Sequence, residues 1–214
     1  MHNPVDKLLS IEKEIYKKNS NIKIIAVSKT FPISKIIPLI KHGHEHFGEN
    51  KVQEAVEKWT SIKNDFPNIK LHMIGKLQTN KIKFALPLFD YIHSLDNLKL
   101  AEKISNEQKK FDKKPKIFIQ INIGEEEQKS GINASSLQNF YSQCINDLDL
   151  DIIGIMCLPP NDLNPEKYFK EMKKLSKETN LKEISMGMSN DYLKAVEYNA
   201  TFLRIGSSIF GPRS

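Results

Sequence analysis

Short apolar runs alternate with longer amphipathic segments along this chain of 214 residues. Several runs are hydrophobic at successive positions, as expected for strands that are buried on both faces of a parallel sheet. The pattern predicts eight strands, at 22–28, 44–47, 70–74, 90–94, 116–122, 151–156, 183–186 and 201–205. Helical periodicity predicts a first helix at 4–18 and further helices at 33–42, 50–63, 78–85, 97–111, 134–146, 165–179 and 190–199.

Strand and helix alternate eight times, which is typical of a parallel α/β sheet. Eight units favour a closed (β/α)8 barrel of the TIM type, with the extra amino-terminal helix outside the repeat. An open, doubly wound sheet is the alternative. The length fits one domain over 1–214, and a composition of 39% hydrophobic residues is enough for a sizeable core.

Composition then excludes several classes of protein. The formal charge is +6, but the 30 lysines are spread among acidic residues, which favours a solvated surface over a nucleic-acid-binding face. Cys144 and Cys157 lack the spacing of a metal or disulfide framework. We expect a cytoplasmic protein without a membrane segment, because neither a signal-peptide pattern nor a long apolar run is present.

Lys29 ends the first predicted strand, in the sequence AVSKT. This position places the amine at the carboxyl-terminal rim of the barrel, where enzymes of this fold carry their sites. Desolvation and neighbouring positive charge lower the pKa of a lysine, and the neutral amine can attack an aldehyde to form a Schiff base. An ordinary solvated lysine is the alternative.

Two clusters of small residues follow the last two predicted strands, SMGMS at 185–189 and GSS at 206–208. Loops at these positions of the fold commonly bind phosphate. Backbone N–H groups and hydroxyls there could hold a dianion without an arginine. Ser189 also fits the N-cap of the helix predicted from Asn190.

Arg204 is one of only two arginines and lies in the apolar run TFLRIG. A chain so rich in lysine is expected to use arginine where a planar, permanently charged donor is needed. A guanidinium only donates hydrogen bonds. If it faced the ring nitrogen of a ligand with a pyridine ring, it would therefore oppose protonation of that nitrogen. A core ion pair with a carboxylate is the alternative.

Other polar residues follow predicted strand ends. Asn50, in FGENKVQE at 47–54, fits either a helix N-cap or a ligand contact. Further candidates in the loops after strands three and five are Gln78, Asn80, Lys81 and Lys129.

Three alternating histidines, His42, His44 and His46, would share one face of an extended segment. Two or three histidines in that arrangement can bind zinc. We expect no metal site here, because no carboxylate or thiolate is placed to complete the ligand set.

Taken together, these motifs resemble those of the pyridoxal phosphate homeostasis proteins, the YggS/PROSC family. The motifs occur in family order from about residue 22 to residue 213: AVSKT, FGENKVQE, HMIGKLQTNK, HSLDN, KSGI, SMGMSND and RIGSSIFGPR. The resemblance implies a barrel like the amino-terminal domain of bacterial alanine racemase. It also implies that pyridoxal 5′-phosphate (PLP) is the cofactor and that Lys29 carries it as a Schiff base.

The resemblance implies further site residues by position. Arg204 would face the pyridine nitrogen; Ser189, Gly206 and Ser207 would hold the phosphate, with Ser185 nearby and Asn50 beside the ring. The implied function is intracellular vitamin B6 homeostasis without an established catalytic turnover, with PLP-dependent apoenzymes as partners. The sequence departs from the family pattern at Lys76, where proline is expected, at Ser207, where threonine is usual, and in the acidic stretch GEEEQKSG.

Two other functions fit a rim lysine. A PLP-dependent amino-acid racemase needs an acid or base on each face of the substrate carbon. Lys29 could serve one face, but no tyrosine lies in a strand-end motif, and we expect no second domain after the eighth strand. A cofactor-free Schiff-base aldolase is the other alternative. We favour the PLP carrier and expect a monomer.

Overall fold

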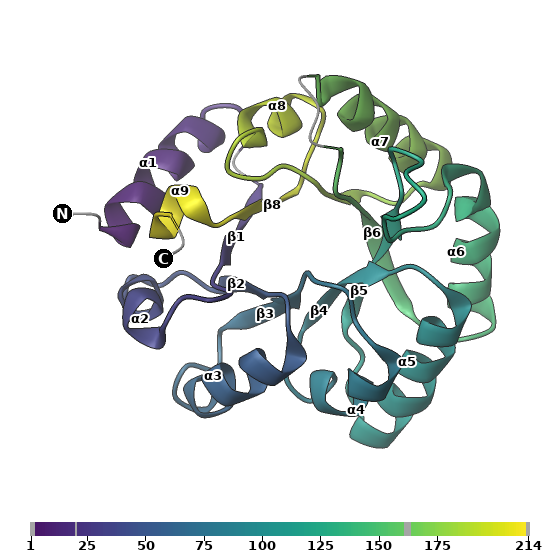
Figure 1. The fold of residues 1–214 in the computed structure, drawn as a ribbon, viewed down its shortest axis with the longest axis horizontal. Coiled ribbons are helices and arrows are strands. Elements are labelled where there is room, and N and C mark those ends of the chain that lie inside the picture. Colours follow the sequence, from purple (N-terminus) through teal and green to yellow (C-terminus); the bar gives the residue numbers. More distant parts are fainter. Residues whose placement is uncertain (1–2, 20, 161–163, 213–214) are drawn as a thin grey trace.

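The computed structural model describes residues 3–19, 21–160 and 164–212. Its eight parallel strands form a closed barrel in sequence order, with helices around the outside (Figure 1). The strands are β1 Lys23–Val27, β2 His46–Glu49, β3 Lys70–Met73, β4 Tyr91–Leu95, β5 Lys116–Ile121, β6 Asp151–Cys157, β7 Glu183–Ser185 and β8 Phe202–Ile205. The barrel closes through β1 and β8, where Ile25 pairs with Arg204. The predicted (β/α)8 barrel is confirmed, and the open sheet is wrong.

The helices follow the predicted alternation. They are α2 Ile33–Lys41, α3 Val52–Asp65, η1 Thr79–Lys81, α4 Ile82–Ala85, α5 Leu98–Phe111, η2 Ala134–Ser136, α6 Leu137–Asn146, α7 Glu166–Thr179 and α8 Tyr192–Glu197. The extra helix, α1 Pro4–Tyr16, packs against α2 and against α9 Ser207–Phe210, a short helix that the sequence pattern does not predict (Figure 1). Within the described ranges, none of these helices has the length and apolar character needed to cross a membrane.

Strand β2 lies two residues later than predicted. Gly43 has a φ of +98° and turns the chain after α2, so the strand begins only at His46. Gly48, expected just after the strand, lies within it and pairs with Val27 of β1. The helix expected from Asn50 correspondingly begins at Val52. Pairing with the neighbouring strands sets these limits, and local hydrophobicity does not show them.

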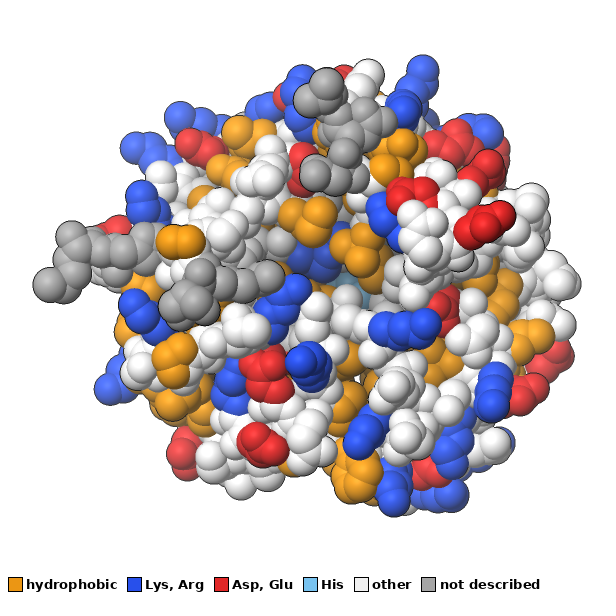
Figure 2. Space-filling view, viewed as in Figure 1, with side chains coloured by type: hydrophobic (Ala, Val, Ile, Leu, Met, Phe, Trp, Pro, Cys, Tyr) orange, Lys and Arg blue, Asp and Glu red, His pale blue; other side chains and the backbone are white. Residues whose placement is uncertain are grey.

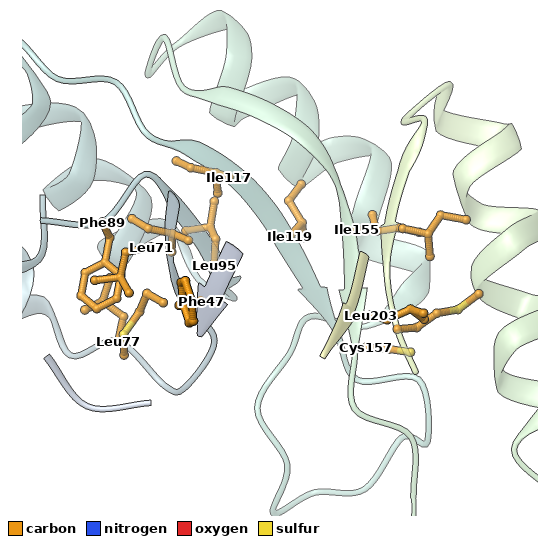
Figure 3. Close-up of a cluster of buried hydrophobic side chains, with 14 of the residues drawn as sticks. Phe47, Leu71, Leu77, Phe89, Leu95, Ile117, Ile119, Ile155, Cys157 and Leu203 are labelled. Atoms are coloured by element: carbon orange, nitrogen blue, oxygen red, sulfur yellow. The ribbon is translucent and has the colours of Figure 1, made fainter. Parts of the chain in front are cut away.

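The main hydrophobic core lies between the barrel and the helices that surround it. Every second strand residue faces outward, because successive side chains of a strand point to opposite faces. Figure 3 shows a cluster of these buried side chains, including Phe47, Leu71, Ile119, Ile155 and Leu203. All five are fully buried, so this layer carries most of the apolar burial that stabilises the fold.

The inside of the barrel is mixed in character. A small cluster of Ile25, Tyr91, Phe118, Met156 and Phe202 fills part of it. Branched apolar residues dominate the interior of most barrels of this type, but here buried polar side chains occupy several other inward positions, among them His72, His93, Ser185 and Arg204. The interior therefore contains groups that must be satisfied by hydrogen bonds.

Candidate functional site

A cavity of about 660 Å³ lies at the carboxyl ends of the strands. Figure 2 shows this face, with a hollow in the middle, basic and histidine side chains visible inside it and hydrophobic side chains at its margin. The lining residues come from β1, β8 and the segments that follow six of the strands: Val27, Lys29, Asn50, Ile74, Leu158, Pro159, Pro160, Pro165, Met188, Ser189, Asn190, Asp191, Arg204, Gly206 and Ser207.

Most of the residues proposed from the sequence line this one cavity: Lys29, Asn50, Ser189, Arg204, Gly206 and Ser207. Ser185 lies one layer deeper and contacts Arg204. The candidates after strands three and five do not line it, namely Gln78, Asn80, Lys81 and Lys129. Lys129 instead pairs with Glu126 at 2.7 Å. Separate segments of the chain thus converge, while the role of each residue stays a prediction.

Ser189 joins the loops after β7 and β8. Its Oγ accepts hydrogen bonds from the backbone N–H groups of Gly206 and Ser208, both at 3.3 Å. The expected N-cap role is wrong, because α8 begins only at Tyr192 with Asp191 as its N-cap residue. The two small-residue segments are therefore in direct contact, as a shared anion site requires.

Asn50 lines the cavity and does not cap a helix. The N-cap residue of α3 is Lys51, so the N-cap interpretation of Asn50 is wrong. Asn50 Oδ1 is buried and has no hydrogen-bond partner within the described part of the chain. Gly75 lets the next loop approach, since a Cβ there would overlap the Asn50 backbone. Buried polar atoms are nearly always paired, so this amide is suited to a polar ligand.

Arg204 is buried, with 4% of its surface exposed. Nη1 donates to Ser185 Oγ at 2.6 Å, and Nη2 donates to the Cys157 carbonyl at 2.7 Å. In the described ranges no carboxylate forms an ion pair with it, so the core ion pair is wrong. Burial lowers the pKa of Arg204, and the electrostatic interactions with Cys157 and Asp191 partly oppose this. A buried cation without a carboxylate partner favours an anion in the adjoining cavity.

The two neighbours of Lys29 are both tied to acidic residues. Ser28 Oγ donates to Glu49 Oε1 at 2.8 Å. The backbone N–H of Thr30, which has a φ of +67°, donates to Glu54 Oε1 at 2.7 Å. These bonds hold the strained turn that carries Lys29 to the cavity.

Lys58 of α3 links both sides of this turn. Its Nζ donates to the Ser28 carbonyl, to Glu49 Oε1 and to Glu54 Oε1, each at 3.0 Å. Burial would raise the pKa of Glu54, but the Thr30 N–H and the Lys58 ammonium outweigh it and hold that pKa below its usual value. We call Glu49, Glu54 and Lys58 the α3 clamp. The sequence shows the i, i+4 pair of Glu54 and Lys58 but not its contact with Ser28.

The alternating histidines are not on one extended segment, because β2 begins only at His46, although all three line the cavity at the amino-terminal ends of the strands. His42 is the helical C-cap of α2, and His44 Nε2 lies 2.9 Å from the carbonyl of His46. Among the described residues, no group of three or more His, Cys, Asp or Glu side chains is arranged to hold a metal ion.

A histidine chain instead crosses the barrel interior. His46 Nδ1 lies 2.9 Å from His72 Nε2, His72 Nδ1 lies 2.9 Å from His93 Nε2, and His93 Nδ1 lies 2.9 Å from Ser185 Oγ. Since Ser185 also accepts from Arg204, the chain leads directly to the cavity. No local sequence pattern indicates this chain, because the three imidazoles come from three strands.

Comparison with known proteins agrees with this architecture. Residues 10–214 match the family model described as alanine racemase, N-terminal domain. The pyridoxal phosphate homeostasis protein of Haemophilus influenzae is 36% identical, over 94% of this chain and 90% of that protein.

Solved structures give the same picture. PipY of Synechococcus elongatus, with PLP bound, is 31% identical and superposes with a TM-score of 0.87, over 97% of this chain and 100% of that one. The alanine racemase of Clostridium difficile has a TM-score of 0.74 at 16% identity. It covers 98% of this chain and 56% of its own, and it shows the shared fold alone.

The α3 clamp leads to a prediction about stability. Lys58→Met leaves the fully buried Glu49 without its ammonium partner, so we expect the free energy of unfolding to fall by about 3 kcal/mol. Lys174→Met is the matched control, because Lys174 pairs with Glu171 and Glu178 on an exposed helix face, where water screens the charges and the loss is much smaller. Urea unfolding measures the loss of stability in both variants. Equal losses would contradict the role of the α3 clamp in stability.

The buried histidines lead to a prediction about pH. Burial lowers the pKa of His44 and His46 to about 4 and those of His72 and His93 well below 6.5. In the unfolded chain these imidazoles take up protons near pH 6.5, so below that pH the unfolded state binds more protons. Stability is therefore present above pH 6.5 and lost as the pH falls towards 4, by up to about 1.4 kcal/mol per pH unit for each histidine.

Urea unfolding between pH 7 and pH 5 tests this slope. His44→Gln removes one of the titrating imidazoles. The slope of the free energy of unfolding against pH should therefore be shallower by the contribution of that histidine. A constant m value across the pH range is the control for an unchanged unfolding transition. A free energy of unfolding that does not vary with pH in this range would show that the imidazoles are not held neutral.

Proposed function

The chain belongs to the family of the pyridoxal phosphate homeostasis proteins, and from this premise we propose that it binds PLP in the 660 Å³ cavity and acts in vitamin B6 homeostasis. One observation carries the proposal. A lysine, a buried arginine that forms no ion pair with a carboxylate of residues 3–19, 21–160 or 164–212, and two small-residue segments line the same cavity. An amine, a fixed cation and hydroxyl and N–H donors are what an aldehyde with a phosphate group requires.

The proposed contacts follow from the lining of the cavity. Lys29 forms the Schiff base with the aldehyde carbon, and its amine is positioned by the α3 clamp through Ser28 and Thr30. Ser189, Gly206 and Ser207 bind the phosphate, because Ser189 already joins the two segments. The buried amide of Asn50 supplies a polar contact beside the ring.

Arg204 determines how the ring behaves. In the proposed arrangement its guanidinium donates to the pyridine nitrogen and opposes protonation there. When bound, PLP supplies an electrophilic carbon and an electron-withdrawing ring, and a ring without the pyridinium charge withdraws electrons less strongly. Ser185 does not reach the cavity, so we assign it to holding Arg204 and not to the phosphate. These features support a carrier over a racemase.

The cellular role follows the family. We propose a single-domain, cytoplasmic monomer over 1–214 that exchanges PLP with PLP-dependent apoenzymes. The aldolase alternative has less support, because a cofactor-free aldolase has no need for a phosphate-binding segment beside its lysine. The family relatives supply the support for homeostasis, while the cavity supplies the support for binding.

Borohydride trapping tests the central claim. With saturating PLP we expect an absorbance band near the visible edge. After reduction we expect a stable mass gain of one reduced PLP per chain, located on the peptide that contains Lys29. Lys29→Ala should lose the gain. Lys76→Ala is the matched control, because Lys76 is an exposed lysine that also follows a strand and lies outside the cavity. No mass gain in the wild type would overturn PLP attachment.

Chiral analysis separates the carrier from a racemase. After overnight incubation of the PLP-loaded protein with L-alanine, we expect no more D-alanine than with Lys29→Ala. The physical reason is the weak electron withdrawal that Arg204 imposes on the ring. D-alanine that accumulates with the wild type and is lost in Lys29→Ala would establish the racemase.

A further inference from the structure

The histidine chain connects two cavities at opposite ends of the barrel. One end is Arg204, which lines the cavity at the carboxyl ends of the strands. The other end is His46, which lines a cavity of about 340 Å³ at the amino-terminal ends. Between them His72 and His93 are fully buried, stacked on Tyr91 and Phe118 with ring centroids 4.2 Å apart in each pair. The histidine chain is therefore held in place by packing inside the barrel.

The hydrogen atoms in this chain have only one consistent arrangement. Each nitrogen–nitrogen contact of 2.9 Å is a hydrogen bond and needs one hydrogen atom. Arg204 only donates, so Ser185 Oγ accepts from it. The Ser185 hydroxyl then donates to His93 Nδ1, because in the described part of the chain it has no other acceptor within hydrogen-bond distance.

The remaining positions follow in order. A neutral imidazole carries one N–H, so His93, which accepts at Nδ1, must donate from Nε2 to His72 Nδ1. His72 likewise donates from Nε2 to His46 Nδ1. All three rings then carry hydrogen at Nε2, and every N–H points away from Arg204. The reverse direction would leave the buried Ser185 hydroxyl hydrogen without an acceptor, which is costly.

We propose that the dipoles of this chain stabilise the positive charge of Arg204. His46, His72, His93 and Ser185 then act as positioning residues for the guanidinium. Three aligned imidazole dipoles present their negative ends to a buried cation whose hydrogen bonds, in the described part of the chain, go to a serine hydroxyl and a backbone carbonyl. Hydrogen bonds in such a chain polarise one another in a low-dielectric interior. The effect on a bound cofactor rests on the proposed function; the arrangement of hydrogen atoms does not.

Nitrogen-15 NMR of the ligand-free protein tests the arrangement. Long-range correlation spectra distinguish Nδ1–H from Nε2–H in each histidine. We expect His46, His72 and His93 to be neutral with hydrogen at Nε2 at pH 7. In Ser185→Ala the donor to His93 is lost, so we expect His93 to shift towards a mixture of both forms. Ser185→Thr keeps the hydroxyl and should restore the wild-type spectrum.

Tyr91→Phe is the matched control, because it keeps the ring stacked on His72 and removes no member of the chain. A wild-type His93 with hydrogen at Nδ1 would overturn the proposal. Unchanged histidine spectra in Ser185→Ala would also overturn the proposal. The direction of the hydrogen bonds along the chain would then not depend on its link to Arg204 through Ser185.

A second readout uses the PLP-loaded protein. Without the negative end of the chain, Arg204 places more positive field on the ring. In Ser185→Ala we therefore expect the pH midpoint of the absorbance change to move down by about one unit, or about tenfold in proton affinity. Ser185→Thr and Tyr91→Phe should keep the wild-type midpoint, and an unshifted Ser185→Ala would contradict the coupling. If the wild type takes up no PLP, the proposed function fails, while the NMR spectra still decide the arrangement.

Discussion

The buried positive charge of Arg204 is the constraint on which the rest of the site depends. Removing a guanidinium from water is costly, and no carboxylate among the described residues forms a direct ion pair with it; Asp191 acts on it only through its field. The barrel instead surrounds it with neutral acceptors, a serine hydroxyl and a backbone carbonyl, and leaves it at the wall of a cavity. A carboxylate partner would neutralise Arg204 and weaken its attraction for an anion. Holding it with neutral acceptors keeps that attraction available to a ligand.

The fold is largely predictable because most strands are marked by their own apolar residues. The strand at 22–28 and the helix at 165–179 needed no information from elsewhere in the chain. Strand β2 was misplaced because HEHF is weakly apolar, and its limits depend on pairing with β1 and β3. Helix α9 was missed because four residues carry no periodicity, and its first residue was assigned only to a phosphate loop.

The site was predictable only where a residue's position along a strand decides its place. Lys29, Gly206 and Ser207 follow strand ends, and all strand ends of a parallel barrel meet at one rim. Contacts inside and behind the rim depend on which strands become neighbours. His93 and Ser185 lie 92 residues apart, and Lys58 reaches Ser28 across 30 residues. No local sequence pattern indicates that residues so far apart along the chain are in contact. These polar contacts are therefore seen only in the closed barrel.

The two polar systems act on the cavity from different sides. The α3 clamp lies outside the sheet and fixes the turn that carries Lys29. The histidine chain lies inside the sheet and fixes Arg204. A barrel interior filled with branched apolar residues would be simpler to stabilise, so the polar interior has a cost in stability that the outer core must offset. This division favours a protein that holds its ligand in one fixed geometry. Burial keeps the pKa of His72 and of His93 low, so the inner system acts on the cavity through hydrogen bonds and dipoles and not through net charge.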